Sequence, residues 1–412
     1  MLNVDIDRLI AELDRLAHMS DAEAPAVTRV LYTQPDMRAR AMLKEMCTAA
    51  GLQVREDAVG NLFARWLGRE PNLPAVGTGS HTDAIPYSGR YDGTVGVLGG
   101  LEAIRTLQAA GFSPKRSIEL LMFTSEEPTR FGIGCVGCRL MSGAIEPAAC
   151  AELRDSAGAR FDDVRLAAGF TGTLASARLG SDYYSAFVEL HIEQGPILED
   201  KNLAIGAVTA IAAPAALRVE LTGSGGHAGA VLMPIRRDAL CAAAEIVLAV
   251  EAAAKESGSP DTVGTVGICD VHPGAINSVP SEVNLTIDIR DVAPGPRDGA
   301  VERTRQVIDA VCAKRGVAAE IETIHSDPPA AMAEHVVRAV EQAAVAAGAS
   351  CIRMVSRAYH DSLFMARIAP TGMIFIPCYK GYSHRPDEYS SPGAIKTGVE
   401  VLARTLRELS EA

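Results

Sequence analysis

Two mainly apolar segments with a helical pattern between them restrict most strongly how this chain can fold. Residues 73–78 and 118–124 are short and largely apolar, which is typical of strands buried inside a sheet. Residues 95–108 between them have the apolar spacing of a helix. A strand, a helix and a second strand in this order predict an α/β domain whose mixed, largely parallel sheet is flanked by helices.

A different order of elements begins near residue 209. The apolar patterns predict strand 216–222, helix 237–254, strand 263–269, strand 283–289, helix 298–314 and strand 318–323. This β-α-β-β-α-β order is the plan of a small ferredoxin-like α+β domain. Because histidines of the metal-binding type resume at His360 and His384, we expect residues 209–324 to be an insert. Residues 1–208 and 325–412 would then form the larger domain.

The composition indicates a folded protein that acts on a small molecule. Of its 412 residues, 48% are hydrophobic, which is enough for two packed domains. The net charge of -12 argues against nucleic acid or an anionic membrane as a partner, because both bind basic surfaces. There is no uncharged apolar run of about 18 residues, and the first eight residues are acidic where a signal peptide would be basic. We therefore expect a cytoplasmic protein.

The nine cysteines are scattered and odd in number, as expected for reduced thiols rather than a disulfide framework. Cys135 and Cys138 form a Cys-x-x-Cys pair, a spacing found in redox and zinc sites. Because no second pair lies at a matching distance, we interpret them as small buried residues that follow a strand.

Histidines and acids gather where the predicted strands end. His81 and Asp83 follow one strand, His191 closes another, and Asp92 lies in a glycine-rich turn. In open α/β sheets, ligands bind at the carboxyl ends of the strands. Imidazole mixed with excess carboxylate predicts a site for more than one divalent ion, with Asp92 as the bridge between two ions. Asp83 would orient the ring of His81.

Glu126 and Glu127 follow a strongly apolar strand. Adjacent like charges in that position are costly unless a cation or a proton takes up the charge. We expect Glu127 to bind an ion and Glu126 to act as general base. His191 would bind one ion, and His384, in a loop between Gly381 and Pro386, would bind the other.

Several segments together resemble a known family, the metal-dependent amidohydrolases of ureido compounds. This M20-type group includes N-carbamoyl-L-amino acid hydrolases, allantoate amidohydrolases and ureidoglycolate amidohydrolases, within the aminopeptidase-like dizinc superfamily. The segments are 79–83, 89–93, 189–196, 225–229 and 383–384. Within the group, four further segments are most similar to ureidoglycolate amidohydrolases: 83–89, 123–132, 356–364 and 377–384.

The resemblance implies a role for each candidate residue and for the insert. The insert would be a lid that also forms a homodimer, and two divalent ions per subunit are expected, with Mn²⁺ favoured and Zn²⁺ possible. The implied metal ligands are His81, Asp92, Glu127, His191 and His384. The implied catalytic residues are Glu126, Asp83, His227 and His360, with the last two as oxyanion donors or substrate ligands. The implied substrate-binding residues are Gln194, Asn277 and Arg290, the arginine because its fork matches a carboxylate.

The expected function is hydrolysis of a C–N bond in a small ureido acid. The favoured substrate is ureidoglycolate, which would yield glyoxylate, ammonia and CO₂ by attack of a metal-bridging hydroxide with Glu126 as base. The alternatives are an N-carbamoyl-L-amino acid hydrolase or an allantoate amidohydrolase, and more remotely an M20 dipeptidase or aminopeptidase. A non-catalytic metal-binding protein is disfavoured, because Glu126 would have no task in binding alone.

Overall fold

The computed structural model describes residues 2–412, which divide into two compact units. The first unit comprises the residues up to Thr209 together with Met332–Ser356 and His360–Ala412. The second unit comprises Ala210–Ala331 and Arg357–Tyr359. Across residues 2–412, none of the helices has the length and apolar character needed to cross a membrane.

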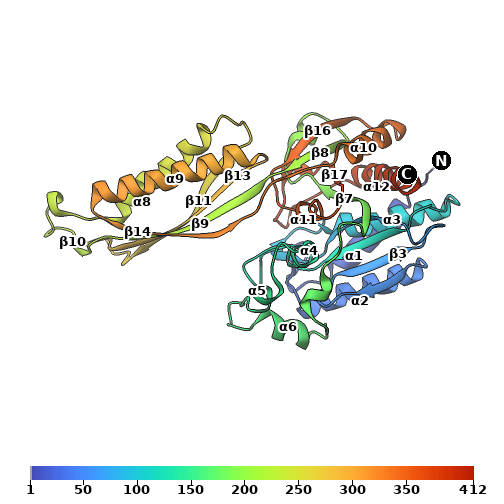
Figure 1. Cartoon of the computed structure of the whole chain (residues 1–412), viewed down its shortest axis with the longest axis horizontal. Coiled ribbons are helices and arrows are strands. Elements are labelled where there is room, and N and C mark those ends of the chain that lie inside the picture. Colours follow the sequence, from blue (N-terminus) through green and yellow to red (C-terminus); the bar gives the residue numbers. More distant parts are fainter. Residues whose placement is uncertain (1) are drawn as a thin grey trace. The chain divides into compact units, whose positions relative to one another are not determined.

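A mixed sheet forms the centre of the first unit (Figure 1). Its strands run in the order β8-β17-β7-β4-β6-β3-β2, and β16 also pairs with β8. The four central strands, β17, β7, β4 and β6, are parallel to one another, whereas β17 with β8, β6 with β3 and β3 with β2 pair antiparallel. The strands are β2 (Gln53–Glu56), β3 (Leu62–Trp66), β4 (Ala75–His81), β6 (Ile118–Phe123), β7 (Tyr184–Ile192), β8 (Ile205–Ile211), β16 (Cys351–Ser356) and β17 (Thr371–Ile376).

Helices cover both faces of this sheet. Every residue of β4, β6 and β17 is buried, as expected for parallel strands with helices on either side. Along β7, Leu190 packs beside Gly99 of α3, while Glu189 accepts a hydrogen bond from Ser362 of α11. Since neighbouring strand residues point to opposite faces, α3 and α11 lie on opposite sides. The expected α/β sheet with flanking helices is confirmed.

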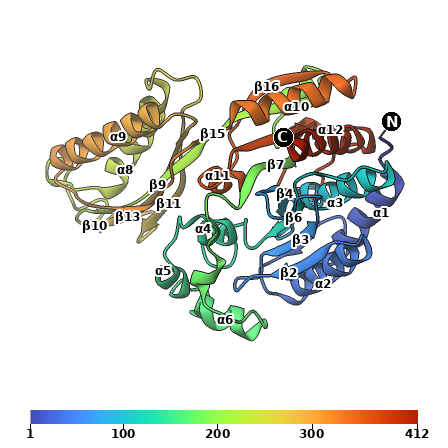
Figure 2. The same cartoon turned by 45° about the vertical axis from the view of Figure 1, so that its right-hand side comes forward.

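The larger helices of this unit pack one against the next, α1 on α3, α3 on α12 and α12 on α10 (Figure 2). Helix α12 illustrates why, since its buried residues Ile395, Val399, Leu402 and Leu406 recur every three to four positions. The helices are α1 (Ile6–Ala17), α2 (Gln34–Ala49), α3 (Thr94–Ala109), α4 (Val136–Ser142), α5 (Pro147–Ala151), α6 (Phe161–Ala167), α7 (Ile197–Asp200), α10 (Glu334–Ala346), α11 (Ser362–Met365) and α12 (Pro392–Glu411). Shorter elements are β1 (Val27–Arg29), β5 (Ala84–Ser88), η1 (Leu174–Ala177) and η3 (Tyr379–Gly381).

The second unit is an antiparallel sheet with the strand order β11-β13-β9-β14 and two helices on one face (Figure 1). Its main elements follow the predicted β-α-β-β-α-β order. They are β9 (Ala213–Thr222), α8 (Ala239–Lys255), β11 (Val263–His272), β13 (Glu282–Asp291), α9 (Pro294–Arg315) and β14 (Ala318–Ser326). The smaller elements are β10 (Gly226–His227), η2 (Met233–Ile235), β12 (Ser278–Val279) and β15 (Ala330–Ala331).

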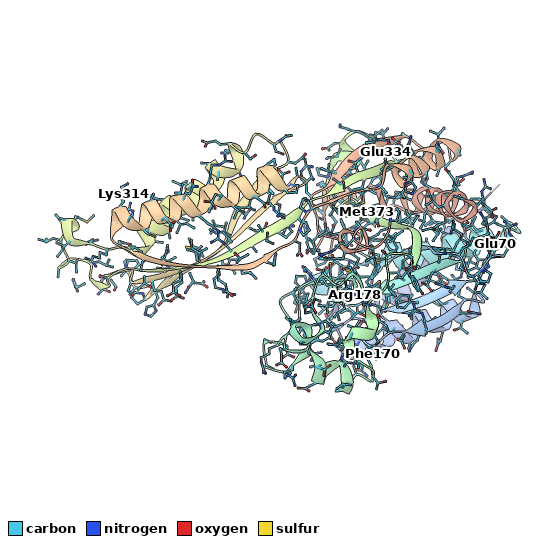
Figure 3. The ribbon with its side chains drawn as sticks, in the orientation of Figure 1. Glu70, Phe170, Arg178, Lys314, Glu334 and Met373 are labelled. Carbon is cyan, nitrogen blue, oxygen red and sulfur yellow. The ribbon has the colours of Figure 1, made fainter. Side chains whose placement is uncertain are left out.

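Alternating burial along β13 explains the packing of this unit. Its apolar residues Val283, Leu285, Ile287 and Ile289 are buried, and the residues between them are partly exposed. One face of the sheet therefore packs on α8 and α9. Figure 3 contrasts the two kinds of environment, with Met373 of β17 inside the first unit and Lys314 of α9 projecting from the second.

Candidate metal centre

The predicted residues of the first unit meet at the carboxyl ends of its parallel strands. His81 is the last residue of β4, His191 is the last but one of β7, and Glu126 and Glu127 follow β6. Asp92 lies just before α3, and His384 follows η3. Segments that are about 300 residues apart in the chain thus come together at one edge of the sheet.

Asp92 lies between two sets of ligand-type side chains. Its Oδ1 is 3.1 Å from Nε2 of His191 and 3.4 Å from Nε2 of His81. Its Oδ2 is 3.2 Å from Nε2 of His384, which is also 3.4 Å from Oε1 of Glu127. We call His81, Asp92 and His191 the first ligand group, and Asp92, Glu127 and His384 the second. Within each group, the ligand atoms all lie within 4.8 Å of one another.

The rings of His81 and His191 are held with Nε2 toward Asp92. Nδ1 of His81 is 3.0 Å from the carbonyl oxygen of Asp83, and Nδ1 of His191 is 2.8 Å from that of Ile192. A carbonyl only accepts, so Nδ1 must carry the proton in both rings. Nε2 of each ring is then the nitrogen that faces the site, and once deprotonated it can offer its lone pair to a metal ion.

Gly93 leaves room for His81 at this point. Its backbone has φ +64°, and a Cβ atom there would lie 2.4 Å from Nε2 of His81. A larger residue would displace the imidazole, so the close approach requires glycine.

Asp83 supports the site in a way that differs in detail from the expected one. The carbonyl oxygen of Asp83, rather than its carboxylate, is the closer partner of His81, since Oδ1 is 3.7 Å from Nδ1. The carboxylate instead accepts the backbone N–H groups of Glu126 and Glu127 at 3.3 and 3.0 Å. Burial raises the pKa of Asp83 to about 6, although nearby His81 lowers it.

Glu126 and Glu127 face different groups. Oε2 of Glu126 is 3.7 Å from Nε2 of His81, whereas Glu127 lies against His384. Burial raises the pKa of Glu126 well above its usual value, His81 opposes the shift and Glu127 adds to it. A buried acid with a raised pKa beside a histidine–carboxylate cluster is suited to taking and returning a proton.

The donor set fits two divalent ions. Three imidazoles and two carboxylates suit Zn²⁺, Mn²⁺ or a related ion, and the two oxygens of Asp92 each face one group. Buried Oε1 of Glu127 lies 3.4 Å from Nε2 of His384. The pKa of His384 is raised to about 11 by hydrogen bonding to Asp92 and Glu127. Buried acids that hold a proton on a neighbouring histidine in this way can instead stabilise a bound cation.

Gln194 and His360 are also in this region. Nε2 of Gln194 donates to Oδ2 of Asp92 at 2.7 Å, while its buried Oε1 has no hydrogen-bond partner within the described part of the chain. The ring of His360 packs edge-on to His191 with centroids 4.6 Å apart, and its Nε2 is 2.9 Å from Oγ of Ser356. Burial and the neighbouring His191 lower the pKa of His360 well below its usual value, so the ring is neutral.

The remaining predicted residues lie in the second unit, at two different ends of its sheet. His227 pairs with Ser278 in the β10–β12 ladder, and the carbonyl oxygen of Asn277 accepts the N–H of Ala228. Nδ1 of His227 accepts the N–H of Gly229 at 3.1 Å, so Nε2 carries the proton and can donate. This tautomer is opposite to that of His81 and His191.

Arg290 and Asn277, both implied as substrate-binding residues, do not meet within one chain. Arg290 is near the end of β13, where its guanidinium binds Asp288 at 2.7 Å, whereas Asn277 precedes the other end of this strand. Eight residue steps separate Glu282 from Arg290, which at about 3.4 Å per step is roughly 27 Å.

Glu189 and Glu388 are two buried acids near the ligand groups that the sequence did not predict as site residues. Glu189 lies in the middle of β7 and accepts hydrogen bonds from Ser80 and Ser362. The sequence did contain a sign of Glu189, because a charged side chain inside an apolar strand needs a buried partner. Glu388 accepts the backbone N–H groups of Tyr91 and Asp92. Nothing in the sequence distinguishes it from its exposed neighbour Asp387.

The cysteine pair is buried, as expected, and each thiol contacts an acid. Sγ of Cys138 is 2.8 Å from Oδ1 of Asp361, and Sγ of Cys135 is 3.6 Å from Oε1 of Glu126. Burial raises the pKa of both thiols well above its usual value, so they are unreactive.

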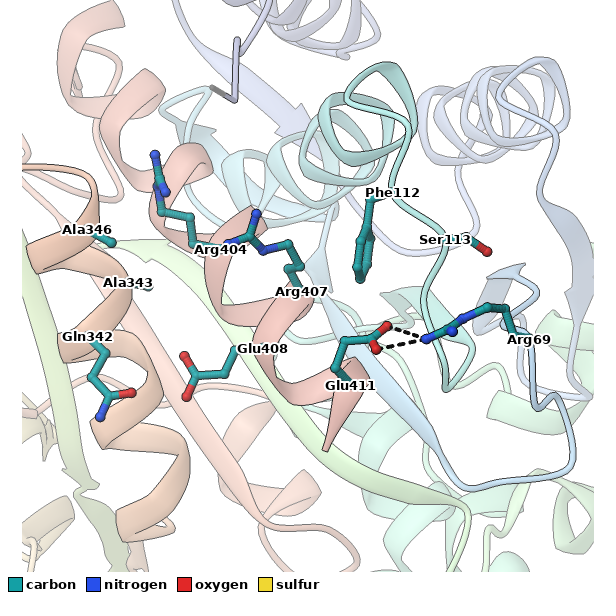
Figure 4. Close-up of a pocket in the computed structure, with 10 residues that line it drawn as sticks. All are labelled: Arg69, Phe112, Ser113, Gln342, Ala343, Ala346, Arg404, Arg407, Glu408 and Glu411. Carbon is teal, nitrogen blue, oxygen red and sulfur yellow. Dashed lines mark hydrogen bonds and ion pairs between the residues drawn. The ribbon is translucent and has the colours of Figure 1, made fainter.

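A surface groove of about 820 Å³ lies elsewhere in the first unit (Figure 4). Its lining includes Phe112, Arg404, Arg407 and the ion pair of Arg69 with Glu411. The groove shares no residue with either ligand group, and most of its charges are already paired within the protein.

Comparison with known proteins identifies the family of this chain. The family model described as peptidase family M20/M25/M40 matches residues 77–408. A ureidoglycolate hydrolase from Arabidopsis thaliana is 55% identical over 416 residues, covering 99% of this chain and 87% of that protein. An N-carbamoyl-L-amino-acid amidohydrolase from Paenarthrobacter aurescens is 37% identical, covering 98% of this chain and 97% of that protein.

Solved structures give the same result. The crystal structure of AtUAH in complex with glyoxylate has a TM-score of 0.90 at 54% identity, covering 99% of this chain and 98% of that one. The aminopeptidase PepT from Bacillus cereus has a TM-score of 0.69 at 16% identity over 99% of this chain and all of that one, a likeness of fold alone.

The fold and the cluster at the strand ends define the class: an aminopeptidase-like α/β protein with candidate metal-binding groups beside a buried acid. The chain belongs to peptidase family M20/M25/M40, as the resemblance predicted. Its relatives include a ureidoglycolate hydrolase and a carbamoyl amino acid amidohydrolase.

Proposed function

We propose that this protein is a metal-dependent amidohydrolase that cleaves the ureido C–N bond of a small ureido acid, with (S)-ureidoglycolate as the favoured substrate. The observation that carries the proposal is the position of Asp92 between two ligand groups with Glu126 beside the first. The identity of 55% with a ureidoglycolate hydrolase supports the choice of substrate.

His81, Asp92 and His191 would hold one divalent ion, and Asp92, Glu127 and His384 the other. When bound, such ions supply Lewis acidity that lowers the pKa of a water molecule and polarises a carbonyl group. The negative charge of the two groups and the fixed tautomers of His81 and His191 support this assignment. Mn²⁺ is the favoured ion, with Zn²⁺ as the alternative.

Glu126 would perform the proton transfers. It accepts a proton from the attacking water as the oxygen adds to the ureido carbonyl carbon, and then returns it to the departing nitrogen. The terminal C–N bond breaks and releases ammonia. The remaining carbamate loses CO₂ and then a second ammonia, leaving glyoxylate. The raised pKa of Glu126 supports both directions of transfer.

Neutral imidazoles would stabilise the oxyanion of the tetrahedral intermediate. His227 has its Nε2–H available because Nδ1 already accepts a hydrogen bond, and His360 is neutral because it is buried. Gln194 would orient the substrate through its unpartnered Oε1. The guanidinium of Arg290 would bind the substrate carboxylate in exchange for Asp288.

The separation of Arg290 from Asn277 supports a homodimer formed through the inserted residues. A small ureido acid is only a few ångströms long and cannot reach both ends of a strand that spans roughly 27 Å between Glu282 and Arg290. We propose that Arg290 of one subunit and His227 with Asn277 of the other serve one substrate molecule. We also propose that the inserted domain, residues 209–324, acts as a lid. The proposed location is the cytoplasm.

An N-carbamoyl-L-amino acid hydrolase is the second candidate, favoured by the 37% identity over nearly the whole chain. Purified protein stripped with a chelator and reloaded with Mn²⁺ or Zn²⁺ should be offered ureidoglycolate, allantoate, N-carbamoyl amino acids and dipeptides side by side. Metal-dependent ammonia release from ureidoglycolate at the highest kcat/KM is expected. Preferential cleavage of a carbamoyl amino acid or a peptide would overturn the substrate assignment, and full activity after chelation would overturn the metal.

A further inference from the structure

Glu388 joins two loops that carry ligand residues. One carboxylate oxygen, Oε1, accepts the backbone N–H groups of Tyr91 at 2.7 Å and Asp92 at 3.1 Å. The other, Oε2, is 3.0 Å from the hydroxyl of Ser383, the residue before His384. A single side chain thus contacts the loop of the shared ligand Asp92 and the loop of His384, which are about 290 residues apart in the chain.

The side chain of Glu388 is buried and tightly packed. The side chain is only 4% exposed, and a Cβ atom on Gly89 would lie 2.4 Å from its carboxyl carbon. The backbone N–H of Glu388 donates to the carbonyl oxygen of Arg385, which closes a turn directly after His384. Tyr389 next to it packs edge-on to Tyr91 with centroids 6.1 Å apart. Contacts on both sides fix the carboxylate in one place.

Ser383 continues the connection to the side chain of Asp92. Its Oγ is 2.8 Å from Oδ2 of Asp92, the oxygen that faces His384. A hydroxyl carries one proton, so Ser383 donates to only one of the two carboxylates at a time. Glu388 thus holds the backbone of Asp92 directly and keeps Ser383 within hydrogen-bonding distance of Oδ2. Both contacts favour the orientation of the Asp92 carboxylate in which each oxygen faces its own ligand group.

We infer that Glu388 is a positioning residue that holds Asp92 in the orientation needed to serve both ligand groups. The inference rests on the proposed two-ion function and deepens it. Residues that orient metal ligands without touching the ion typically change metal affinity by roughly 10- to 100-fold when they are removed. Glu388 should act in this way on both ions, because the ligand it holds is shared.

The test compares Glu388→Ala, Glu388→Gln and the control Glu102→Ala. Glu102 is also a fully buried carboxylate that accepts a backbone N–H, from Asp5, but none of its contacts is to a residue of either ligand group. The glutamine variant keeps an oxygen for the two N–H groups and offers an amide donor to Ser383. Mn²⁺ binding is measured by calorimetry, kcat and KM are measured separately, and amide hydrogen exchange is followed at residues 89–93 in the metal-free protein.

The alanine variant at 388 should bind Mn²⁺ about tenfold more weakly or worse, with lower kcat, little change in KM and faster exchange at Tyr91 and Asp92. The glutamine variant should recover most of the affinity. Unchanged Mn²⁺ affinity in Glu388→Ala, or an equal loss in Glu102→Ala, would overturn the inference. If the wild type binds two ions but cleaves no ureido acid, only the proposed substrate fails. If it binds no ion, the proposed function fails, and unchanged exchange in Glu388→Ala would then overturn the positioning role.

Discussion

The carboxylate of Asp83 accepts the backbone N–H of Glu127 at 3.0 Å. A buried acid at the end of one strand thereby fixes the loop that follows the neighbouring strand. The side chains of Glu126 and Glu127 diverge from this fixed point, one toward each ligand group.

Replacing Asp83 by alanine should lower both stability and activity. Two buried N–H groups would lose their acceptor, at a cost of about 1–3 kcal/mol each. Thermal unfolding should show a lower Tm, and kcat should fall because Glu126 is no longer held. Asp83→Asn, which keeps one acceptor oxygen, should lie between the wild type and the alanine variant. A stable and fully active Asp83→Ala enzyme would contradict this role.

Replacing Glu126 by glutamine should remove turnover and leave the ions in place. The change preserves shape but removes the base, and loss of a general base typically costs about 100- to 10,000-fold in rate. Metal content measured by mass spectrometry should equal that of the wild type. Glu127→Gln is the matched comparison, because it should lose bound metal as well as activity. Loss of metal from Glu126→Gln instead would reverse the two assignments.

Metal binding should release protons at neutral pH. In the metal-free protein, hydrogen bonding to Asp92 and Glu127 raises the pKa of His384 to about 11, so the ring is charged at pH 7 and must lose a proton to bind an ion. Calorimetry in buffers of different ionisation enthalpy measures this release. Binding without proton release would exclude His384 as a ligand.

The same shift determines how the metal-free protein responds to pH. A charged His384 stabilises the fold fully below pH 6.5, and this contribution is lost as pH rises through its folded pKa of about 11. The raised pKa of Glu126, caused chiefly by burial, acts in the same direction, since the folded state again binds more protons than the unfolded state. The Tm of chelated protein should therefore fall between pH 7 and pH 10, and that of metal-loaded protein should fall less. A Tm that rises over this range would contradict the assignment.

Two inactive variants should restore activity when mixed. If each site takes Arg290 from one subunit and His227 from the other, a mixed dimer of Arg290→Ala and His227→Ala has one site with both residues intact. Random exchange of subunits should then recover about a quarter of wild-type activity. Exposed Arg407→Ala, assayed alone, controls for loss of a surface arginine. No recovery, with subunit exchange shown by mass spectrometry, would mean that both residues act within one chain.

The parts of the fold that repeat a simple pattern were predictable from the sequence. The helix expected at 95–108 spans 94–109, and the strand expected at 118–124 spans 118–123. The strand expected at 73–78 instead runs from Ala75 to His81, because β4 stays paired with β6 through its polar last residues. The apolar pattern could not predict this polar end of the strand, because it shows only where apolar residues recur.

The residues of the candidate site also fall into those that the sequence reveals and those that it does not. His81, Asp92 and His384 carry chemistry that their residue types reveal, and the structure brings them together. Glu388 acts through hydrogen bonds to a backbone that is almost 300 residues away, and such a contact leaves no local signal. The resemblance implies that Arg290 and Asn277 both bind the substrate, but within one chain they lie near opposite ends of β13. Resemblance to a family therefore named these residues without revealing their separation.

The alternating burial of β13 also limits how this part of the chain can change in length. Inserting or deleting one residue within Glu282–Asp291 would turn every later side chain to the other face of the sheet. Ile287 and Ile289 would enter solvent, and Arg290 would point into the core beneath α8 and α9. Length changes are therefore confined to the connections between elements, such as residues 256–262, and the distance along β13 stays fixed by its register.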